Sequence, residues 1–389
     1  MTNLSKTVWT LSLISLFTDI ASEMLYPVMP LYLKNIGLSF AFIGILEGIA
    51  EAIASLSKGY FGQLSDASGK KVVFVRFGYA LSAFAKPMIA LFNSPLWILF
   101  SRTLDRFGKG IRTGARDAML SEESTKETKG TVFGFHRSMD TLGAFLGPIL
   151  ALLYLYFYSS DYKHLFYFAF APGIFAVVLS FALKEKRISA KAPSNKKISF
   201  LSFIKYLKTS SNDYRKLVFP LLFFSLFNSS DFFLLLKAKQ IGIDDKYVIF
   251  VYIFYNFIYV IFSFPLGVIA DKLGLRKVFI VGIGLFSFVY VGMAYANNLG
   301  ILLALFFLYG IYAAATEGIS KAWISNIVSK DEIATAIGTY SAFQSLCLMT
   351  ASFVAGLIWD LASPKAAFLL TFAASFLVLI YMIIVNIKD

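Results

Sequence analysis

The sequence predicts an all-α polytopic membrane protein, with twelve transmembrane helices in two pseudo-symmetric six-helix bundles. Three observations predict this fold class: a composition poor in charge, twelve apolar runs of helical length, and an internal repeat. Of the 389 residues, 58% are hydrophobic and 15% are charged, and the mean hydropathy is +0.71. Because about a quarter of the residues in a soluble domain are charged, soluble enzymes and nucleic-acid-binding proteins are disfavoured. One cysteine and two histidines exclude disulfide scaffolds and Cys/His metal clusters, so no cofactor or metal is expected.

The apolar runs have the length that a membrane-spanning helix requires, about 20 residues for a hydrocarbon core about 30 Å thick. Transmembrane β-strands are shorter and alternate in polarity, which these runs do not. The first run follows neither a basic segment nor a small-residue cleavage site, so we expect it to be retained. The predicted spans are 7–33, 40–64, 72–92, 96–119, 131–157, 164–183, 217–239, 247–270, 278–296, 300–325, 333–359 and 366–387.

Basic residues predict the orientation of the chain in the membrane. Segment 184–216 carries ten Lys or Arg residues against two acids, and the connections 65–76 and 271–277 are also basic. The alternate connections near 93–95 and 297–298 are uncharged. We therefore expect both termini and the 184–216 linker on the cytoplasmic side of a bacterial cytoplasmic (inner) membrane. The net charge of +13 then faces anionic membrane lipids, and no nucleic-acid partner is expected.

The two halves of the chain repeat one design. The sequence GQLSDASGKK at 62–71 recurs as GVIADKLGLRK at 267–277, and Gly110-Ile111 and Gly130-Thr131 recur 208 residues later. This duplication predicts an N-terminal six-helix bundle at 1–183, a basic cytoplasmic linker at 184–216 and a C-terminal bundle at 217–389. Parallel repeats of this kind are related by an axis along the membrane normal and enclose a site near mid-membrane.

The repeated loop resembles the signature loop of the major facilitator superfamily, and the resemblance covers the whole chain. RFGKGIRTG at 106–114 is similar to the fourth-helix RxxQGxG-type motif of that family, with Lys109 at the position of the usual Gln. GAFLGP at 143–148 resembles the fifth-helix motif of drug/proton antiporters, but Leu150-Ala151 replaces its Gly-Gly continuation. The resemblance implies that the chain is a monomeric secondary transporter of a bacterial branch of the family. It also implies that the repeated loop acts as a cytoplasmic latch between conformations. The residues expected to act in gating are Gly62, Asp66, Gly69, Lys70, Lys71, Arg112, Arg116, Gly267, Asp271, Gly274 and Arg276.

Charged residues within the spans indicate where substrate and protons bind, because such residues are costly in lipid and face a partner or a cavity. The basic residues of span 4 form one stripe, the basic stripe, because their spacings of 4, 3, 3 and 4 place them within an arc of about 120° on a helix. The stripe consists of Arg102, Arg106, Lys109, Arg112 and Arg116. We expect substrate to bind at Arg102, Arg106, Lys109, Asp231, Glu317 and Lys321. The acids expected to couple protons are Asp19, Glu23, Glu47, Glu51, Asp105 and Asp140. The alternative interpretation is that many of these charges only neutralise one another inside the first bundle.

The repeat also relates two charges of opposite sign. Lys109 and Glu317 occupy equivalent positions at the offset of 208. A pseudo-two-fold axis would place them opposite each other, so we expect them to pair, or to exchange partners, as the halves rock.

These features predict a secondary active transporter that works by alternating access. No GxxxxGK[ST] motif is present, so ATP is not the expected energy source. Arginine binds carboxylates through two parallel bonds, so the basic stripe favours a small anionic or zwitterionic solute such as an organic acid, a phosphorylated metabolite or a metal chelate. Buried acids favour proton coupling, although sodium coupling and the direction of transport stay open.

Two alternative functions are compatible with the predicted fold. A proton-driven multidrug exporter would have an aromatic, mostly neutral cavity with one or two acids, which the basic stripe disfavours. A non-transporting membrane sensor or assembly factor would need an added soluble domain, and only the linker of about 30 residues is long. An enzyme is not expected, because no nucleophile or metal set is apparent in the sequence.

Overall fold

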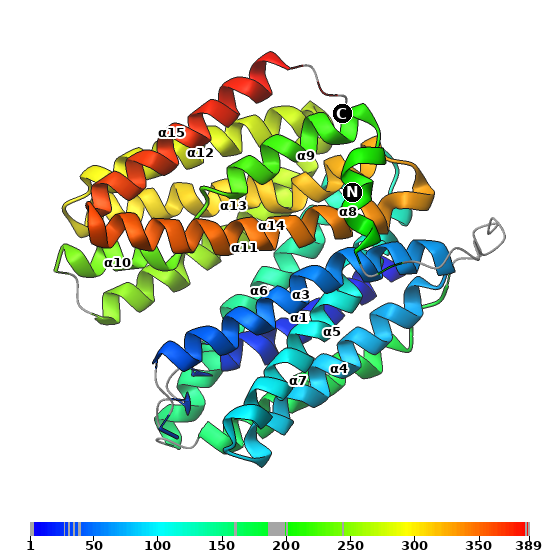
Figure 1. Cartoon of the computed structure of the whole chain (residues 1–389), viewed down its shortest axis with the longest axis horizontal. Coiled ribbons are helices and arrows are strands. Elements are labelled where there is room, and N and C mark those ends of the chain that lie inside the picture. Colours follow the sequence, from blue (N-terminus) through cyan, green and yellow to red (C-terminus); the bar gives the residue numbers. More distant parts are fainter. Residues whose placement is uncertain are drawn as a thin grey trace. The chain divides into compact units, whose positions relative to one another are not determined.

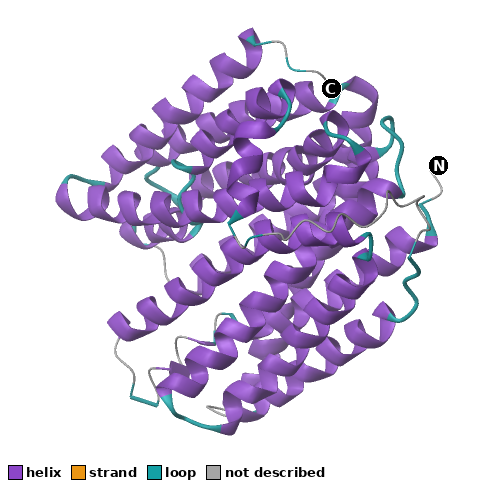
Figure 2. Ribbon diagram, turned by 45° about the vertical axis from the view of Figure 1, so that its right-hand side comes forward, coloured by secondary structure: helices purple, strands orange, loops and turns teal. Residues whose placement is uncertain are grey.

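The chain forms a set of long helices, and the described residues contain no strand (Figure 2). The computed structural model describes residues 4–26, 28–29, 32–33, 36–37, 40–158, 162–185, 199, 201–242, 245–385 and 387, without the side chains of 40–45, 47, 232 and 245–249. In chain order (Figure 1), the helices are α1 (Lys6–Leu25), α3 (Phe40–Ser68), α4 (Lys71–Leu91), α5 (Pro95–Glu122), α6 (Lys129–Phe157), α7 (Tyr162–Ser180), α8 (Ser202–Thr209), α9 (Asn212–Ser225), α10 (Phe232–Gln240), α11 (Asp245–Leu273), α12 (Leu275–Tyr295), α13 (Leu299–Ile327), the 3-10 turn η1 (Lys330–Glu332), α14 (Ile333–Leu361) and α15 (Pro364–Ile384).

Eleven of the predicted spans each overlap one long helix, although α1 ends at Leu25, before the end of span 7–33, and span 217–239 is the exception. It is divided between α9 and α10, with residues 226–231 between them. In the described part of the chain, nine helices are long and apolar enough to cross a membrane: α1, α4, α6, α7, α11, α12, α13, α14 and α15. Within the predicted linker 184–216, the described residues form α8 and the start of α9. Five of the ten basic residues of this segment lie outside the described residues.

The described helices form two compact units that do not follow the two halves of the sequence. Unit 1 contains residues 1–123, 139–209 and 329–342, and unit 2 contains 124–138, 210–328 and 343–389. Each unit therefore includes the first turns of one helix from the other half, α14 in unit 1 and α6 in unit 2. The division at 183 and 217 stays a prediction from the repeat.

Within each unit, one long helix packs between two neighbours. In unit 1, α5 packs against α3 and α4, while α7 packs against α1 and α4. In unit 2, α13 packs in the same way against α11 and α12, and α15 packs against α12. The helices α5 and α13 are the equivalent members of the repeat, so the duplication seen in the sequence is also present in the packing of each unit.

The linker contributes one short helix to unit 1. Phe203 of α8 is 1% exposed, and its ring lies where a Cβ at Gly59 of α3 would come within 2.4 Å of it. Ser202 donates a hydrogen bond to Gln63, and the Tyr206 hydroxyl donates to Glu332 Oε2 at 3.2 Å. Burial and the Glu332 carboxylate raise the pKa of Tyr206 above its ordinary value, so the hydroxyl remains a donor at neutral pH.

Candidate functional site

One group of charged side chains lies inside unit 1, between α4 and α5. Lys86 Nζ is 3.2 Å from Asp105 Oδ1, and Arg102 Nη1 is 3.7 Å from Asp105 Oδ2. Lys86 is 1% exposed and Asp105 is 8% exposed. Buried ions need close partners of opposite charge, which these three residues supply to one another. For Arg102 and Asp105 this geometry favours the interpretation as an internal neutralising network.

The C-terminal half of α5 is also tied into unit 1. Arg112 Nη1 donates to Ser82 Oγ at 2.8 Å, and the guanidinium lies 4.3 Å from the centre of the Tyr79 ring. Arg116 Nη2 lies 2.9 Å from Asp117 Oδ1, and Ser15 of α1 accepts a hydrogen bond from Arg116 Nη1. These contacts bind α5 to α4 and α1, as a rigid element would require.

The remaining basic residues of α5 lie on its accessible side. Lys109 is exposed, and the Glu51 side chain of α3 is 39% exposed. Arg106 Nε is 4.0 Å from Glu51 Oε2, and Lys58 Nζ is 3.7 Å from Glu51 Oε1. The basic stripe therefore divides into a buried, paired part and an accessible part that contains Arg106 and Lys109.

Lys109 is the electrostatic centre of the accessible group. It interacts with Asp19, Glu23 and Glu51, which lie on α1 and α3. Asp140 of α6 interacts electrostatically with Asp19, and it accepts a hydrogen bond from Ser15. Five of the predicted residues are thus brought together around Lys109 in unit 1: Arg106, Asp19, Glu23, Glu51 and Asp140. The side chain of Glu47 lies outside the described residues.

The repeated loop places a carboxylate at a helix N-terminus in each unit. In unit 1, Asp66 accepts hydrogen bonds from the backbone N–H groups of Thr335 (2.6 Å) and Ala334 (3.3 Å), at the start of α14. In unit 2, Asp271 accepts from the backbone N–H groups of Gly130 (2.7 Å) and Thr131 (2.6 Å), at the start of α6. A carboxylate there satisfies orphan N–H groups and the positive end of the helix dipole.

Glycine permits the close approach that these contacts need. A Cβ at Gly62 would lie 2.3 Å from the carbonyl oxygen of Ala334, and one at Gly267 would lie 2.2 Å from that of Gly130. Gly69 and Gly274 turn the chain after α3 and α11 with φ of 64° and 102°, a region that favours glycine. The repeated glycines and aspartates therefore form the same local structure twice.

The basic residues that follow the loops anchor helix ends. Lys71 pairs with Glu122 at the end of α5. Arg276 Nη2 donates to the carbonyl oxygens of Met382 (2.9 Å) and Val385 (2.8 Å), at the end of α15. Lys70 is exposed. The gating role of these residues stays a prediction.

Unit 2 contains a second charged group, on α6, α10 and α13. Glu317 forms an ion pair with Arg137, and Arg137 also donates to the Tyr259 hydroxyl. Asp231 Oδ1 accepts a hydrogen bond from Tyr309 at 2.6 Å. Lys321 is half-buried one turn after Glu317. The structure therefore gives Glu317 a partner within its own unit, and the exchange with Lys109 stays a prediction.

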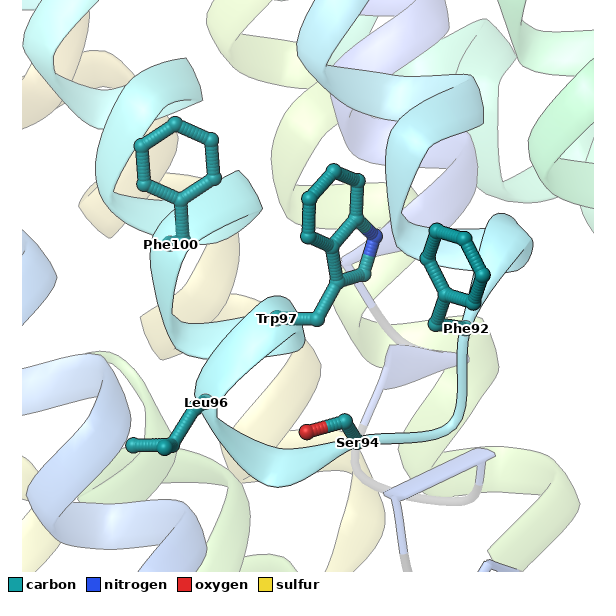
Figure 3. A pocket seen from close by; sticks show the side chains of 5 residues that line it. All are labelled: Phe92, Ser94, Leu96, Trp97 and Phe100. Carbon is teal, nitrogen blue, oxygen red and sulfur yellow. The ribbon is translucent and has the colours of Figure 1, made fainter.

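A surface pocket lies in unit 1 at the turn between α4 and α5 (Figure 3). It is lined by Phe92, Ser94, Leu96, Trp97 and Phe100. The Trp97 indole N–H donates to the Met88 carbonyl oxygen at 2.6 Å. Aromatic side chains with a satisfied polar edge are typical of the membrane interface, and this pocket has no charged lining residue.

The whole chain matches one family, described as the Major Facilitator Superfamily, through residues 11–237 and 218–388. The chain belongs to this superfamily. It is therefore a multi-pass membrane transporter of small molecules. An uncharacterised MFS-type transporter of Methanocaldococcus jannaschii is 35% identical over 372 residues, 94% of this chain and 91% of the relative. The quinolone resistance protein NorA of Staphylococcus aureus is 26% identical over 160 residues, 41% of this chain and 40% of NorA.

Two solved MFS structures share the fold at low sequence identity. The human organic anion transporter MFSD10 gives a TM-score of 0.84 over 98% of this chain and 100% of its own, at 16% identity. The Escherichia coli fucose:proton symporter gives 0.72 over 96% and 98%, at 13% identity. These likenesses confirm the predicted fold class.

Sequence reasoning missed several residues that complete the charged groups of this MFS transporter. Lys86 and Lys58 supply partners to Asp105 and Glu51, and Arg137 supplies one to Glu317. Lys58 and Arg137 are each the only Lys or Arg of their predicted span, and Lys86 shares span 72–92 only with Arg76, near its start. An isolated basic residue in an apolar span is a usable signal. Tyr309 has no such signal, because its contact with Asp231 is visible only once α13 is packed.

Proposed function

We propose that this MFS protein is a secondary active transporter that moves a small anionic or zwitterionic solute by alternating access, coupled to protons. The observation that carries the proposal is the accessible pair Arg106 and Lys109 on α5. An ionised group at membrane depth requires a partner or water, and Lys109 is exposed. Arg106 can present two parallel donors to a carboxylate or phosphate, and Lys109 adds a second positive charge.

The acids around Lys109 support coupling to protons. Three cations, Arg106, Lys109 and Lys58, lie among four carboxyl groups on α1, α3 and α6. Arg102 and Arg116 also act on Glu23 and Asp140, but they are paired with Asp105 and Asp117. With every group ionised, the remaining seven residues carry one net negative charge and repel an anion. Each proton taken up moves the balance by one positive charge. Protonation thus prepares the site for the anion, and Asp19 and Asp140, whose carboxyl groups interact with each other, are the pair best placed to hold the proton.

Similar proteins support the substrate class without deciding it. MFSD10 is described as an organic anion transporter, and the fucose symporter is described as a proton symporter. NorA supports the alternative of a drug exporter, but the match covers less than half of either chain. The buried and accessible basic residues of α5 favour the anion over a cationic drug.

The remaining parts of the proposal follow from the sequence. The basic connections favour a bacterial cytoplasmic membrane with both termini in the cytoplasm, and the resemblance to the family favours a monomer. The sequence halves 1–183 and 217–389 act as the moving bundles. Lys109 and Glu317 exchange partners between states, with Arg137 as the partner of Glu317 in one of them.

A thermal-shift panel on detergent-purified protein tests the proposal. The panel compares carboxylates, phosphorylated metabolites, ferric chelates, amino acids and cationic drugs, each at pH 5.5 and 7.5. An anion at 100 times its dissociation constant stabilises the fold by about 2.7 kcal/mol. We expect stabilisation by an anion, stronger at pH 5.5, and its loss in Arg106→Gln and Lys109→Gln. Lys126→Gln, in the exposed connection before α6, is the matched control. Stabilisation by cationic drugs alone would contradict the proposal.

A further inference from the structure

The break between α9 and α10 is built by the surrounding helices of unit 2. The Ser230 backbone N–H donates to Ser352 Oγ of α14 at 3.0 Å, and the Thr371 hydroxyl of α15 donates to the Phe227 carbonyl oxygen at 3.1 Å. Backbone outside helices is tolerated at membrane depth only where it is buried in protein or lines a cavity. The side chains that satisfy this backbone come from distant parts of the chain, so the break is a specific structure.

A carboxylate without an ion pair lies at this break. Asp231 directly precedes α10, but its side chain makes no capping bond to that helix. It accepts a hydrogen bond from the Tyr309 hydroxyl at 2.6 Å instead, and the Tyr255 ring lies beside that of Tyr309. Among the described residues, no Lys, Arg or His side chain forms an ion pair with the Asp231 carboxylate. Neutral donors alone leave the negative charge of a partly buried carboxylate uncompensated.

A second acceptor lies at the same break. The Asn228 amide nitrogen donates to the Tyr312 hydroxyl at 3.2 Å. The Asn228 amide oxygen is buried and has no hydrogen-bond partner among the described residues. Buried acceptors without a donor are rare in native structures and call for a water, an ion or a ligand. The negative end of the α9 dipole points to the same place, since α9 ends at Ser225.

Aromatic rings surround these acceptors. The rings of Tyr255 and Tyr309 are 5.1 Å apart, and those of Tyr309 and Tyr312 are 5.2 Å apart. The faces of tyrosine rings attract cations. The nearby charges of Glu317 and Arg137 are paired with each other, so they largely cancel at Asp231.

We propose that the α9–α10 break is a binding site for one monovalent cation, held by the Asp231 carboxylate and the Asn228 amide oxygen against the Tyr255 and Tyr309 rings. Discontinuous transmembrane helices supply unwound backbone and helix ends to cations in other transporter folds. The cation is either an alkali ion or the ammonium group of a small amine. The site lies wholly in unit 2 and uses neither Arg106 nor Lys109, so it can fail without the anion proposal failing.

The test measures the melting temperature of the purified full chain in neutral detergent at constant ionic strength. The probes are NaCl, KCl and ethylammonium chloride, each titrated against N-methyl-D-glucamine chloride. We expect saturable stabilisation by at least one probe. Asp231→Asn should weaken its apparent affinity by at least about tenfold, because a charged partner is lost. Asp360→Asn, which removes the same charge from an exposed position on α14, should leave the affinity unchanged.

Each outcome decides the proposal. Stabilisation by sodium or potassium alone identifies an alkali-ion site, and stabilisation by ethylammonium identifies an amine site. No stabilisation of the wild-type chain by any probe overturns the proposal, and so does stabilisation that survives unchanged in Asp231→Asn. If Asp231→Asn does not fold, Tyr309→Phe and Asn228→Ala replace it. Tyr309→Phe keeps the ring, and we expect about a threefold or greater loss of affinity from each variant.

Discussion

The buried ion pair between Lys86 and Asp105 separates structural charges from accessible ones in unit 1. Asp105 has two cationic partners, Lys86 at 3.2 Å and Arg102 at 3.7 Å. Removing one member of a buried pair costs about 3–5 kcal/mol, because the other charge is left without compensation. The two members therefore differ in what their loss leaves behind. Without Lys86, Asp105 still has Arg102, whereas without the Asp105 charge both cations are stranded.

We expect Asp105→Asn to lower the melting temperature of the protein more than Lys86→Met does, as measured in detergent by intrinsic fluorescence. The double variant should be more stable than Asp105→Asn alone, since it removes one of the stranded cations. A double variant less stable than either single variant would show that the pair is not coupled. Asp360→Asn, exposed on α14, controls for loss of a carboxylate as such.

At this scale the sequence placed the basic residues on one arc of one helix, but it did not separate the buried members of that arc from the accessible ones. An arc of about 120° on α5 contains both Arg102, which is 6% exposed, and Lys109, which is exposed. The difference depends on the neighbouring helices, because α4 brings Lys86 and Ser82 against one edge of the arc. Spacing along one helix does not contain that information.

Among the elements, α8 depends most clearly on a tertiary contact. It has eight residues, and isolated helices shorter than about 12 residues are marginal in water. Its attachment to unit 1 is the Phe203 ring against Gly59, together with Ser202 and Tyr206. Removing the ring should therefore release the helix while the transmembrane part stays folded.

We expect Phe203→Ala to raise the rate of trypsin cleavage after Lys205 and Lys208 by about tenfold. This change corresponds to a loss of about 1.4 kcal/mol in the free energy with which α8 packs on unit 1. Both lysines are exposed, so cleavage is limited by opening of the helix. Ile204→Ala is the matched control, because Ile204 is 40% exposed. Equal cleavage of the two variants would argue that α8 is held by its flanking chain instead.

Element boundaries followed the hydropathy of the sequence except at the α9–α10 break. Residues 217–239 are predicted as one span, although Asn228, Ser229, Ser230 and Asp231 form a polar cluster of turn-type residues within it. That cluster is a local signal for a break, but it does not indicate what stabilises the break. The interruption is stabilised by Ser352 and Thr371, more than 100 residues away. Long-range partners of this kind cannot be identified from one sequence.

For the whole molecule, the duplication was predictable because each copy of the loop keeps its own glycines and aspartate. Asp66 and Asp271 each meet a helix N-terminus within their unit. The sequence did not indicate that units 1 and 2 would include segments 329–342 and 124–138 from the opposite halves. That exchange depends on backbone N–H groups at helix starts, which carry no residue-specific signal.

Coupling is a property of the whole transporter, and the charge balance around Lys109 predicts how it behaves. The accessible set of unit 1 carries one net negative charge when every group is ionised, so an anion enters together with at least one proton. In proteoliposomes, an acidic exterior should then drive accumulation of the anion with the largest shift in the panel. The expected ratio is about tenfold per pH unit for each coupled proton.

A substitution in the carboxyl pair of Asp19 and Asp140 tests this prediction most directly. Asp140→Asn removes one negative charge permanently, so the anion should bind equally well at pH 5.5 and 7.5, and the gradient should no longer drive accumulation. Exchange of external for internal anion should continue, because that process needs no net proton movement. Lys126→Gln should behave as wild type in both assays. Gradient-driven accumulation that persists in Asp140→Asn would place the coupling proton on another carboxyl group, and its absence in the wild-type protein would exclude proton coupling altogether.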